Sequence, residues 1–230
     1  MRWSRADLHL HTTCSDGMPA PDVLARRLAR SRLAVAAVTD HDRIEGALRV
    51  EEALAGSGPE IVIGTEVSSR DGHVLALFVT RDVSPGMSAE ATIAAIHEQG
   101  GLAVAAHPYS LALGAGDLAA QLPFDGVEIL NGSPFMEVSN ARAVARLARG
   151  PAARLGGSDA HVTWAAGRVY TLFPGSGATD LRAALLTGQT QPAVDWPGRL
   201  AALPLHVSWL TWLTLRRAAR PVPSSPLSGA

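Results

Sequence analysis

The apolar residues of this chain follow two patterns that alternate along its length. Short continuous runs, typical of buried strands, lie at residues 6–10, 33–38, 60–65, 73–79, 102–106, 125–130 and 168–173. Between most of these runs, apolar residues recur at three- and four-residue intervals, which predicts helices near residues 21–28, 44–54, 88–99, 138–148 and 180–188. Strands that alternate with helices are typical of an α/β fold built on a parallel sheet.

One connection between these runs is too short to hold a helix. The runs at residues 60–65 and 73–79 are joined by a segment that contains Arg70-Asp71-Gly72. A short turn sequence of this kind between two strands predicts an antiparallel hairpin. We therefore expect one antiparallel pair inside an otherwise parallel arrangement.

Histidine and carboxylate residues follow the ends of many of these runs. His9 and His11 are two positions apart on an extended chain, so both side chains point to the same side, and Asp159 and His161 repeat this spacing. The full set of candidate metal ligands is His9, His11, Asp16, His41, Glu66, His73, His107, Asp159 and His161. Taken singly, each is most simply interpreted as an ordinary half-buried polar residue. Together, at successive strand ends, they predict a site for more than one metal ion.

The positions of these ligands decide between two α/β architectures. In an open doubly wound sheet, only the strands near a switch point bring their carboxyl ends together, whereas in a barrel all of them converge on one face. The candidate ligands follow many separate strands, so we expect a TIM-like (β/α) barrel over residues 1–195. Imidazole and carboxylate ligands suit manganese, zinc or iron.

Charge and cysteine content narrow the expected partners and location. The formal net charge is −1 and no basic stripe stands out, so we expect no stable binding of duplex nucleic acid. A small anionic substrate, such as a nucleotide or a short oligonucleotide, remains compatible with this charge. Cys14, the only cysteine, is expected to be a small buried filler, and the N-terminus lacks the apolar core of a signal peptide. Both features favour a cytoplasmic protein.

The C-terminal part differs in composition from the rest of the chain. Residues 200–215 contain Trp209 and Trp212 and no Asp, Glu, Lys or Arg, yet Pro204 and His206 interrupt them and they are too few to span a bilayer. We expect residues 196–220 to form an apolar extension that packs on the barrel or on a second subunit, with both tryptophans largely buried. The alternative is an anchor on a membrane surface. Residues 221–230, rich in Pro and Ser, are expected to be disordered.

Most of the candidate ligands lie in four short motifs. These are Asp7-Leu8-His9-Leu10-His11 with Ser15-Asp16-Gly17, Val38-Thr39-Asp40-His41-Asp42, Ala106-His107-Pro108, and Gly157-Ser158-Asp159-Ala160-His161. Together they resemble the motifs of the polymerase and histidinol phosphatase (PHP) family of metallohydrolases. The resemblance implies a distorted seven-stranded (β/α) barrel and a metal-dependent phosphoesterase that uses a metal-bridging hydroxide on a phosphate mono- or diester. Hydrolysis of a carboxylic ester, amide or carbamate on the same site is one alternative, and a non-catalytic metal-binding accessory domain is another.

The resemblance also implies how the ligands divide among two to three divalent ions. The first ion would be held by His9, His11, Glu66 and Asp159. Glu66 would bridge to a second ion, completed by His73 and His107. The third would be held by Asp16, His41 and His161.

Further roles are expected for residues close to these ligands. The catalytic steps are assigned to Glu66, Asp159, His161 and Asp40. Asp40 and Asp42 would in addition orient imidazole rings, as carboxylates beside metal-binding histidines commonly do. Three residues at or near strand ends are candidates for contacts with a phosphate oxyanion, namely Arg43, Asn131 and Arg168.

Overall fold

Nine strands form one sheet in the computed structural model, which describes residues 2–150 and 152–218. The strands are β1 (Trp3–Asp7), β2 (Val35–Val38), β3 (Glu60–Ser69), β4 (Gly72–Leu77), β5 (Leu102–Ala105), β6 (Gly126–Asn131), β7 (Ala153–Gly157), β8 (Val169–Pro174) and β9 (Gln191–Val194). Their order in the sheet is β7-β6-β5-β4-β3-β2-β1-β8-β9. The groups β1-β2-β3 and β5-β6-β7 are parallel, and β4, β8 and β9 run antiparallel to their neighbours.

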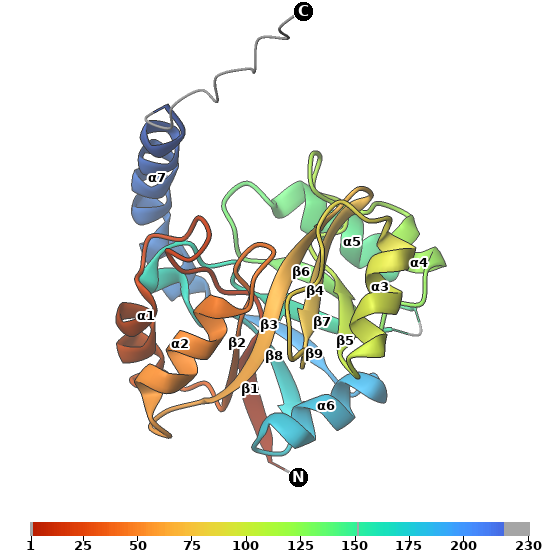
Figure 1. Cartoon of the computed structure of the whole chain (residues 1–230), viewed down its shortest axis with the longest axis horizontal. Helices are drawn as coiled ribbons and strands as arrows, with labels where there is room; N and C mark the ends of the chain where they lie inside the picture. Colours follow the sequence, from red (N-terminus) through yellow and green to blue (C-terminus); the bar gives the residue numbers. More distant parts are fainter. Residues whose placement is uncertain (1, 151, 219–230) are drawn as a thin grey trace, which may run out of the picture.

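The sheet curves until its two ends almost meet (Figure 1). Thr171 of β8, the strand next to the β9 edge, bonds to the β7 edge: its hydroxyl donates to the Gly156 carbonyl at 2.9 Å and accepts from the Gly156 amide at 3.0 Å. The TIM-like barrel expected from the sequence is therefore confirmed, with nine strands in place of seven. β7 ends in two glycines, and β9 contains Pro192, which an edge strand tolerates because one side of it needs no ladder partner.

Helices cover the outside of this sheet. They are α1 (Pro21–Leu28), α2 (Glu45–Leu54), α3 (Ala89–Glu98), α4 (Leu118–Gln121), α5 (Glu137–Leu147) and α6 (Ala178–Leu186). Figure 1 shows α1 and α2 on one side of the barrel and α3, α4 and α5 on the other. The spacing of the apolar residues explains their burial, since α1 turns Leu24 and Leu28 inward. Ser88 caps α3 by accepting from the Ala91 amide at 3.2 Å.

The predicted hairpin is present and places one candidate ligand. β3 and β4 are antiparallel, with Ser68 opposite His73 and Ser69 opposite Gly72. Gly72 has φ +129°, a conformation that L side chains rarely adopt, and a Cβ there would lie 2.4 Å from the Ala115 amide nitrogen. Because β4 begins where β3 ends, His73 lies at the same end of the barrel as the residues that follow the parallel strands.

The C-terminal extension forms a long helix, α7 (Trp196–Ala218), with Pro204 inside it. α7 packs against the short helix η1 (Thr163–Ala165) and then extends away from the barrel (Figure 1). Leu210 and Leu215 are exposed, and Trp209 and Trp212 are half-buried instead of largely buried, because the barrel covers α7 over only part of its length. Contact with a second subunit or a membrane surface stays a prediction. The tail expected at residues 221–230 lies outside the described residues.

None of the helices within the described residues combines the length and the apolarity that crossing a membrane requires.

Candidate metal centre

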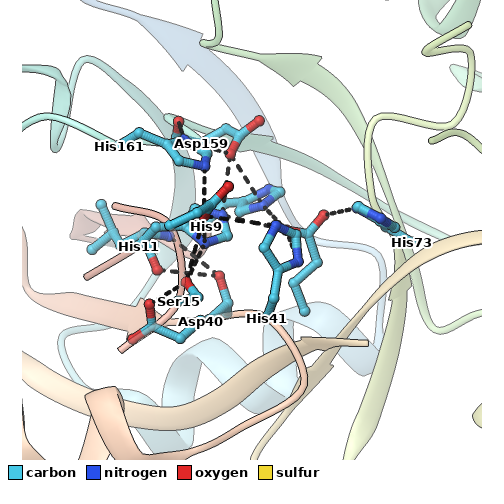
Figure 2. A network of polar contacts seen from close by, with 12 residues as sticks. His9, His11, Ser15, Asp40, His41, His73, Asp159 and His161 are labelled. Carbon is cyan, nitrogen blue, oxygen red and sulfur yellow. Dashed lines mark hydrogen bonds and ion pairs between the residues drawn. The ribbon is translucent and has the colours of Figure 1, made fainter. Parts of the chain in front are cut away.

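The nine candidate ligands come together at one end of the barrel. Seven of them line a cavity of about 950 Å³, and His9 and His11 lie fully buried directly beneath it. The six imidazoles follow one another, with neighbouring ring centroids 4.2 to 5.7 Å apart. Figure 2 shows these side chains pointing toward one another from separate segments of the chain. The strand ends therefore converge and bring the candidate ligands together, as the sequence pattern predicts.

The Glu66 carboxylate occupies the middle of this cluster. Its Oε1 atom lies 2.8 Å from His73 Nδ1 and 2.9 Å from His107 Nε2. Its Oε2 atom lies 3.1 Å from His9 Nε2 and 3.3 Å from His11 Nε2. One buried carboxylate thus faces different imidazoles with each of its two oxygens, which is the geometry that a bridging ligand requires.

A second group of ligands lies on the other side of His11. Asp16 Oδ1 is 3.1 Å from His161 Nε2, 3.7 Å from His11 Nδ1 and 3.8 Å from His41 Nε2. One ligand atom from each of these four residues lies within 4.8 Å of the others, close enough to surround a single ion. Similar groups are formed by His9, His11 and Glu66, by His9, His107 and Asp159, and by His41, Glu66 and His73.

Several buried imidazole nitrogens in this cluster have no hydrogen-bond partner in the described structure. They are His9 Nε2, His11 Nε2, His41 Nδ1 and His107 Nδ1. A buried polar atom without a partner is costly, and such atoms are rare in native proteins. Here they share a small space with carboxylate oxygens, so the donor set fits divalent metal ions, which use imidazole nitrogen and carboxylate oxygen as ligands.

Glu128, in the interior of β6, orients part of this cluster. Its Oε1 accepts from His9 Nδ1 at 3.0 Å, and its Oε2 accepts from the His107 amide and from Asn131 Nδ2, both at 2.9 Å. The bond to Nδ1 leaves Nε2 of His9 free to face the cavity. Glu128 could not be found from the sequence, because one carboxylate within a predicted strand is not distinguishable from a surface residue until the barrel closes around it.

The backbone at two strand ends is held in the left-handed region. His107 has φ +29° and Asp159 has φ +49°, which is uncommon outside glycine and recurs at functional sites. Gly157 lies just before this turn, and a Cβ there would lie 2.3 Å from Glu128 Oε1 and 2.8 Å from His9 Cβ. Glycine at position 157 thus lets the β7 end approach β1 and deliver Asp159 to the cluster.

The charges of the cluster support one another. Burial opposes ionisation of Glu66, but His9, His41 and His73 hold its pKa well below its usual range. In the same way, burial opposes protonation of His11, but Asp159 and Glu66 raise its pKa to about 10. Without ions, the Glu66 carboxylate therefore stays negative and His11 takes up a proton.

Asp40 does not orient an imidazole directly, contrary to our expectation. Its fully buried carboxylate accepts from the Thr12 amide at 2.7 Å, from the Thr12 hydroxyl at 2.6 Å and from Ser15 Oγ at 2.5 Å. Ser15 Oγ in turn lies 3.5 Å from His11 Nδ1 (Figure 2). Asp40 therefore braces the loop after His11, and its place in the catalytic set is not supported by a contact with the reacting space.

Asp42 also stabilises the backbone at this end of the barrel. It accepts from the Ser68 amide at 2.7 Å and from the Ser68 hydroxyl at 3.0 Å. Among the described contacts, none joins Asp42 to an imidazole, so this second expectation of an orienting carboxylate is also not met.

The three residues expected to contact substrate lie in three different environments. Arg43 is exposed and lines the cavity. Asn131 is buried and bonded to Glu128 and Asp159, so it does not face the cavity. Arg168 lines a separate, smaller cavity, where it lies 2.5 Å from Asp195. Neither Asn131 nor Arg168 lines the larger cavity, because position at a strand end does not reveal which way the side chain turns, and their contact with substrate stays a prediction.

Two further residues line the cavity wall. Trp209 of α7 donates from its indole to the Asp16 carbonyl at 2.9 Å, and its ring lies 4.2 Å from that of His161. Cys14 is half-buried on the same wall, so it is not the fully buried filler that we expected. The contact of Trp209 shows that the apolar C-terminal segment takes part in the site.

Comparison with known proteins agrees with this geometry. The PHP domain model matches residues 7–115, and a model described as PHP-associated matches residues 138–190. An uncharacterised protein from Methanocaldococcus jannaschii is 37% identical over 139 residues, which cover 55% of this chain and 81% of that protein. The chain belongs to the PHP family, and its fold is that of a PHP-like barrel.

Two proteins of described activity show more limited similarity. The 5′-3′ exoribonuclease Rnm from Salmonella typhimurium is 34% identical over 77 residues, which cover 31% of this chain and only 26% of the exoribonuclease. A two-domain protein from Bacteroides vulgatus that contains a predicted PHP-like metal-dependent phosphoesterase superposes with a TM-score of 0.65 at 18% identity, over 84% of this chain and 65% of that one.

Proposed function

We propose that this protein is a metal-dependent phosphoesterase that hydrolyses a phosphate mono- or diester. The observation that carries the proposal is the Glu66 carboxylate, which faces imidazoles with both oxygens, beside buried imidazole nitrogens that have no hydrogen-bond partner among the described residues. A purely structural cluster would pair these atoms by hydrogen bonds. An arrangement that leaves them facing one space suits a polynuclear metal centre.

The ligands divide most simply into three sets, of which the first two share Glu66. The first set is His9, His11, Glu66 and Asp159, the second is Glu66, His73 and His107, and the third is Asp16, His41 and His161. Bound divalent ions supply a nucleophile by lowering the pKa of water and neutralise charge on phosphoryl oxygens. Manganese, zinc and iron all suit these donors.

The remaining groups of the site position a small anionic substrate. Arg43 is exposed on the cavity wall, where its guanidinium can bind phosphate oxygens in a forked geometry. Glu128 holds His9 Nδ1, and the Asp159 carbonyl accepts from His161 Nδ1 at 3.0 Å, so both rings keep a fixed orientation as substrate enters. A cavity of about 950 Å³ has room for a nucleotide or the end of a short oligonucleotide.

Similarity to an exoribonuclease and to a phosphoesterase supports phosphate esters over other substrates. The direct test is a panel of a phosphomonoester, a phosphodiester and a carboxylic ester, assayed after reconstitution with Mn or Zn. We expect hydrolysis of at least one phosphate ester, and Glu66→Gln should lower the rate by about 100-fold or more. The exposed Glu98→Gln is the matched control and should retain full activity. Turnover of the carboxylic ester alone would overturn the proposal.

A further inference from the structure

A second cavity, separate from the metal centre, is lined mainly by arginine. It has a volume of about 370 Å³ and shares no lining residue with the larger cavity. Its charged lining residues are Arg5, Arg27, Arg30, Arg32, Arg168 and Asp195. Five cations and one anion around one hollow are unexpected in a chain whose formal net charge is −1. Arg27, Arg30 and Arg32 are close in the sequence, but only the fold brings Arg5 and Arg168 to them.

Two of these arginines are fixed by contacts that leave their charge uncancelled. Arg27 donates to the carbonyls of Thr163 and Ala166 at 3.3 and 3.4 Å, and neutral carbonyls do not offset its charge. Arg5 lies over the ring of Tyr170, with 4.7 Å between the guanidinium carbon and the ring centroid. Fixed guanidinium groups lose less conformational entropy when they bind an anion than free ones do.

The balance of charge inside the cavity favours a bound anion. Arg168 is paired with Asp195, the acidic residue of the lining. Burial lowers the pKa of Arg27 first, and the positive charge of Arg168 lowers it further, which shows that like charges face each other there. Arg30 and Arg32 are exposed, and no side-chain hydrogen bond or ion pair joins either of them to the described residues. An oxyanion placed among these guanidinium groups would relieve their repulsion.

We propose that this arginine cavity is a second binding site, for a small phosphate-type oxyanion. Guanidinium groups bind phosphate through pairs of parallel hydrogen bonds, and several of them around a concave site suit a doubly or more highly charged group. A volume of about 370 Å³ fits a phosphate or a diphosphate group. The site does not depend on the chemistry at the metal centre, because no metal-centre residue lines it.

The solution test is titration calorimetry of the full chain with inorganic pyrophosphate at constant ionic strength. The double variant R30Q/R32Q removes two exposed charges that form no hydrogen bond or ion pair with another described side chain, so its fold should persist. The control R81Q/R149Q removes two exposed charges that line neither cavity. We expect one binding event to weaken at least tenfold in R30Q/R32Q and to stay unchanged in the control. Equal titrations of all three proteins would overturn the proposal.

The location can be checked independently in crystals soaked with tungstate, a phosphate-like oxyanion with a strong anomalous signal. We expect an anomalous peak between Arg27, Arg30 and Arg168 in addition to any peak at the metal centre. Density at the metal centre alone, at a concentration that saturates the calorimetric signal, would contradict a second site. Hydrolysis of small substrates should be equal in the wild type and R30Q/R32Q, so failure of this inference is distinguishable from failure of the proposed function.

Discussion

Glu128 accepts a hydrogen bond from Nδ1 of His9 at 3.0 Å, and this bond decides which nitrogen of His9 faces the metal centre. With one proton held on Nδ1, Nε2 points toward Glu66, 3.1 Å away, and can bind a metal ion once its own proton has left. A carboxylate that accepts this bond fixes the orientation of the imidazole and also raises its basicity. Glu128 is thus a positioning residue, which acts on the proposed ions through His9.

This relationship gives the first prediction. In Glu128→Gln, the amide loses charge and places a donor where the carboxylate accepts from His9, the His107 amide and Asn131. We expect metal affinity to fall by about 10- to 100-fold, measured by competition with a chromogenic chelator. The exposed Glu52→Gln should bind metal like the wild type. Unchanged affinity in Glu128→Gln would show that Glu128 does not orient His9.

The second prediction concerns pH. The pKa of His11 is raised to about 10 and that of His9 well above its usual value, although burial alone would lower both. Both rings therefore carry protons in the ion-free site at neutral pH, and these protons must leave before a metal binds. Metal affinity should rise as pH increases from about 6 toward about 10, the pKa of His11, with net proton release.

Calorimetry in buffers of different ionisation enthalpy measures this proton release directly. His41 has a lowered pKa, chiefly because of burial, so it is already neutral and should contribute no proton. An apparent enthalpy that is the same in all buffers would contradict the account.

Trp209 provides the third prediction. Trp209→Phe keeps an aromatic ring beside His161 but removes the indole N–H that donates to the Asp16 carbonyl. A hydrogen bond of this kind contributes about 0.5–1.5 kcal/mol, so we expect kcat/KM to fall by about 2- to 10-fold. Trp212→Phe, on the same helix but not on the cavity wall, is the matched control. Equal activity of the two variants would place α7 outside the active site.

The sequence revealed the ligands better than it revealed their surroundings. His73 could be placed because the short turn at Gly72 forces a hairpin, and a hairpin returns the chain to the end where Glu66 lies. The placement of His73 and the other ligands depends only on local geometry and on the convergence of strand ends. Glu128 and Trp209 could not be placed, because their contacts depend on closure of the barrel and on docking of α7 across a separation of 193 residues.

Arg168 and Asn131 show the converse limit of the sequence, because both were expected to contact substrate and neither lines the larger cavity. Both follow or flank strands in the manner of active-site residues, yet Arg168 turns to Asp195 and Asn131 turns inward to Glu128. Side-chain direction at a strand end depends on the loop conformation, which neighbouring segments impose. The arginine cavity arises from the same cause, since Arg5, Arg27 and Arg168 lie far apart in the sequence and meet only in the fold.

The most direct test of the central claim is the metal content of the purified chain after reconstitution with Mn or Zn and removal of excess ion. The account predicts two to three ions per chain by elemental analysis. It also predicts the loss of at least one ion in Glu66→Gln, because both oxygens of Glu66 face ligand imidazoles. A wild-type chain that retains one ion or none, or a Glu66→Gln variant that binds as many ions as the wild type, would contradict a polynuclear centre built around Glu66.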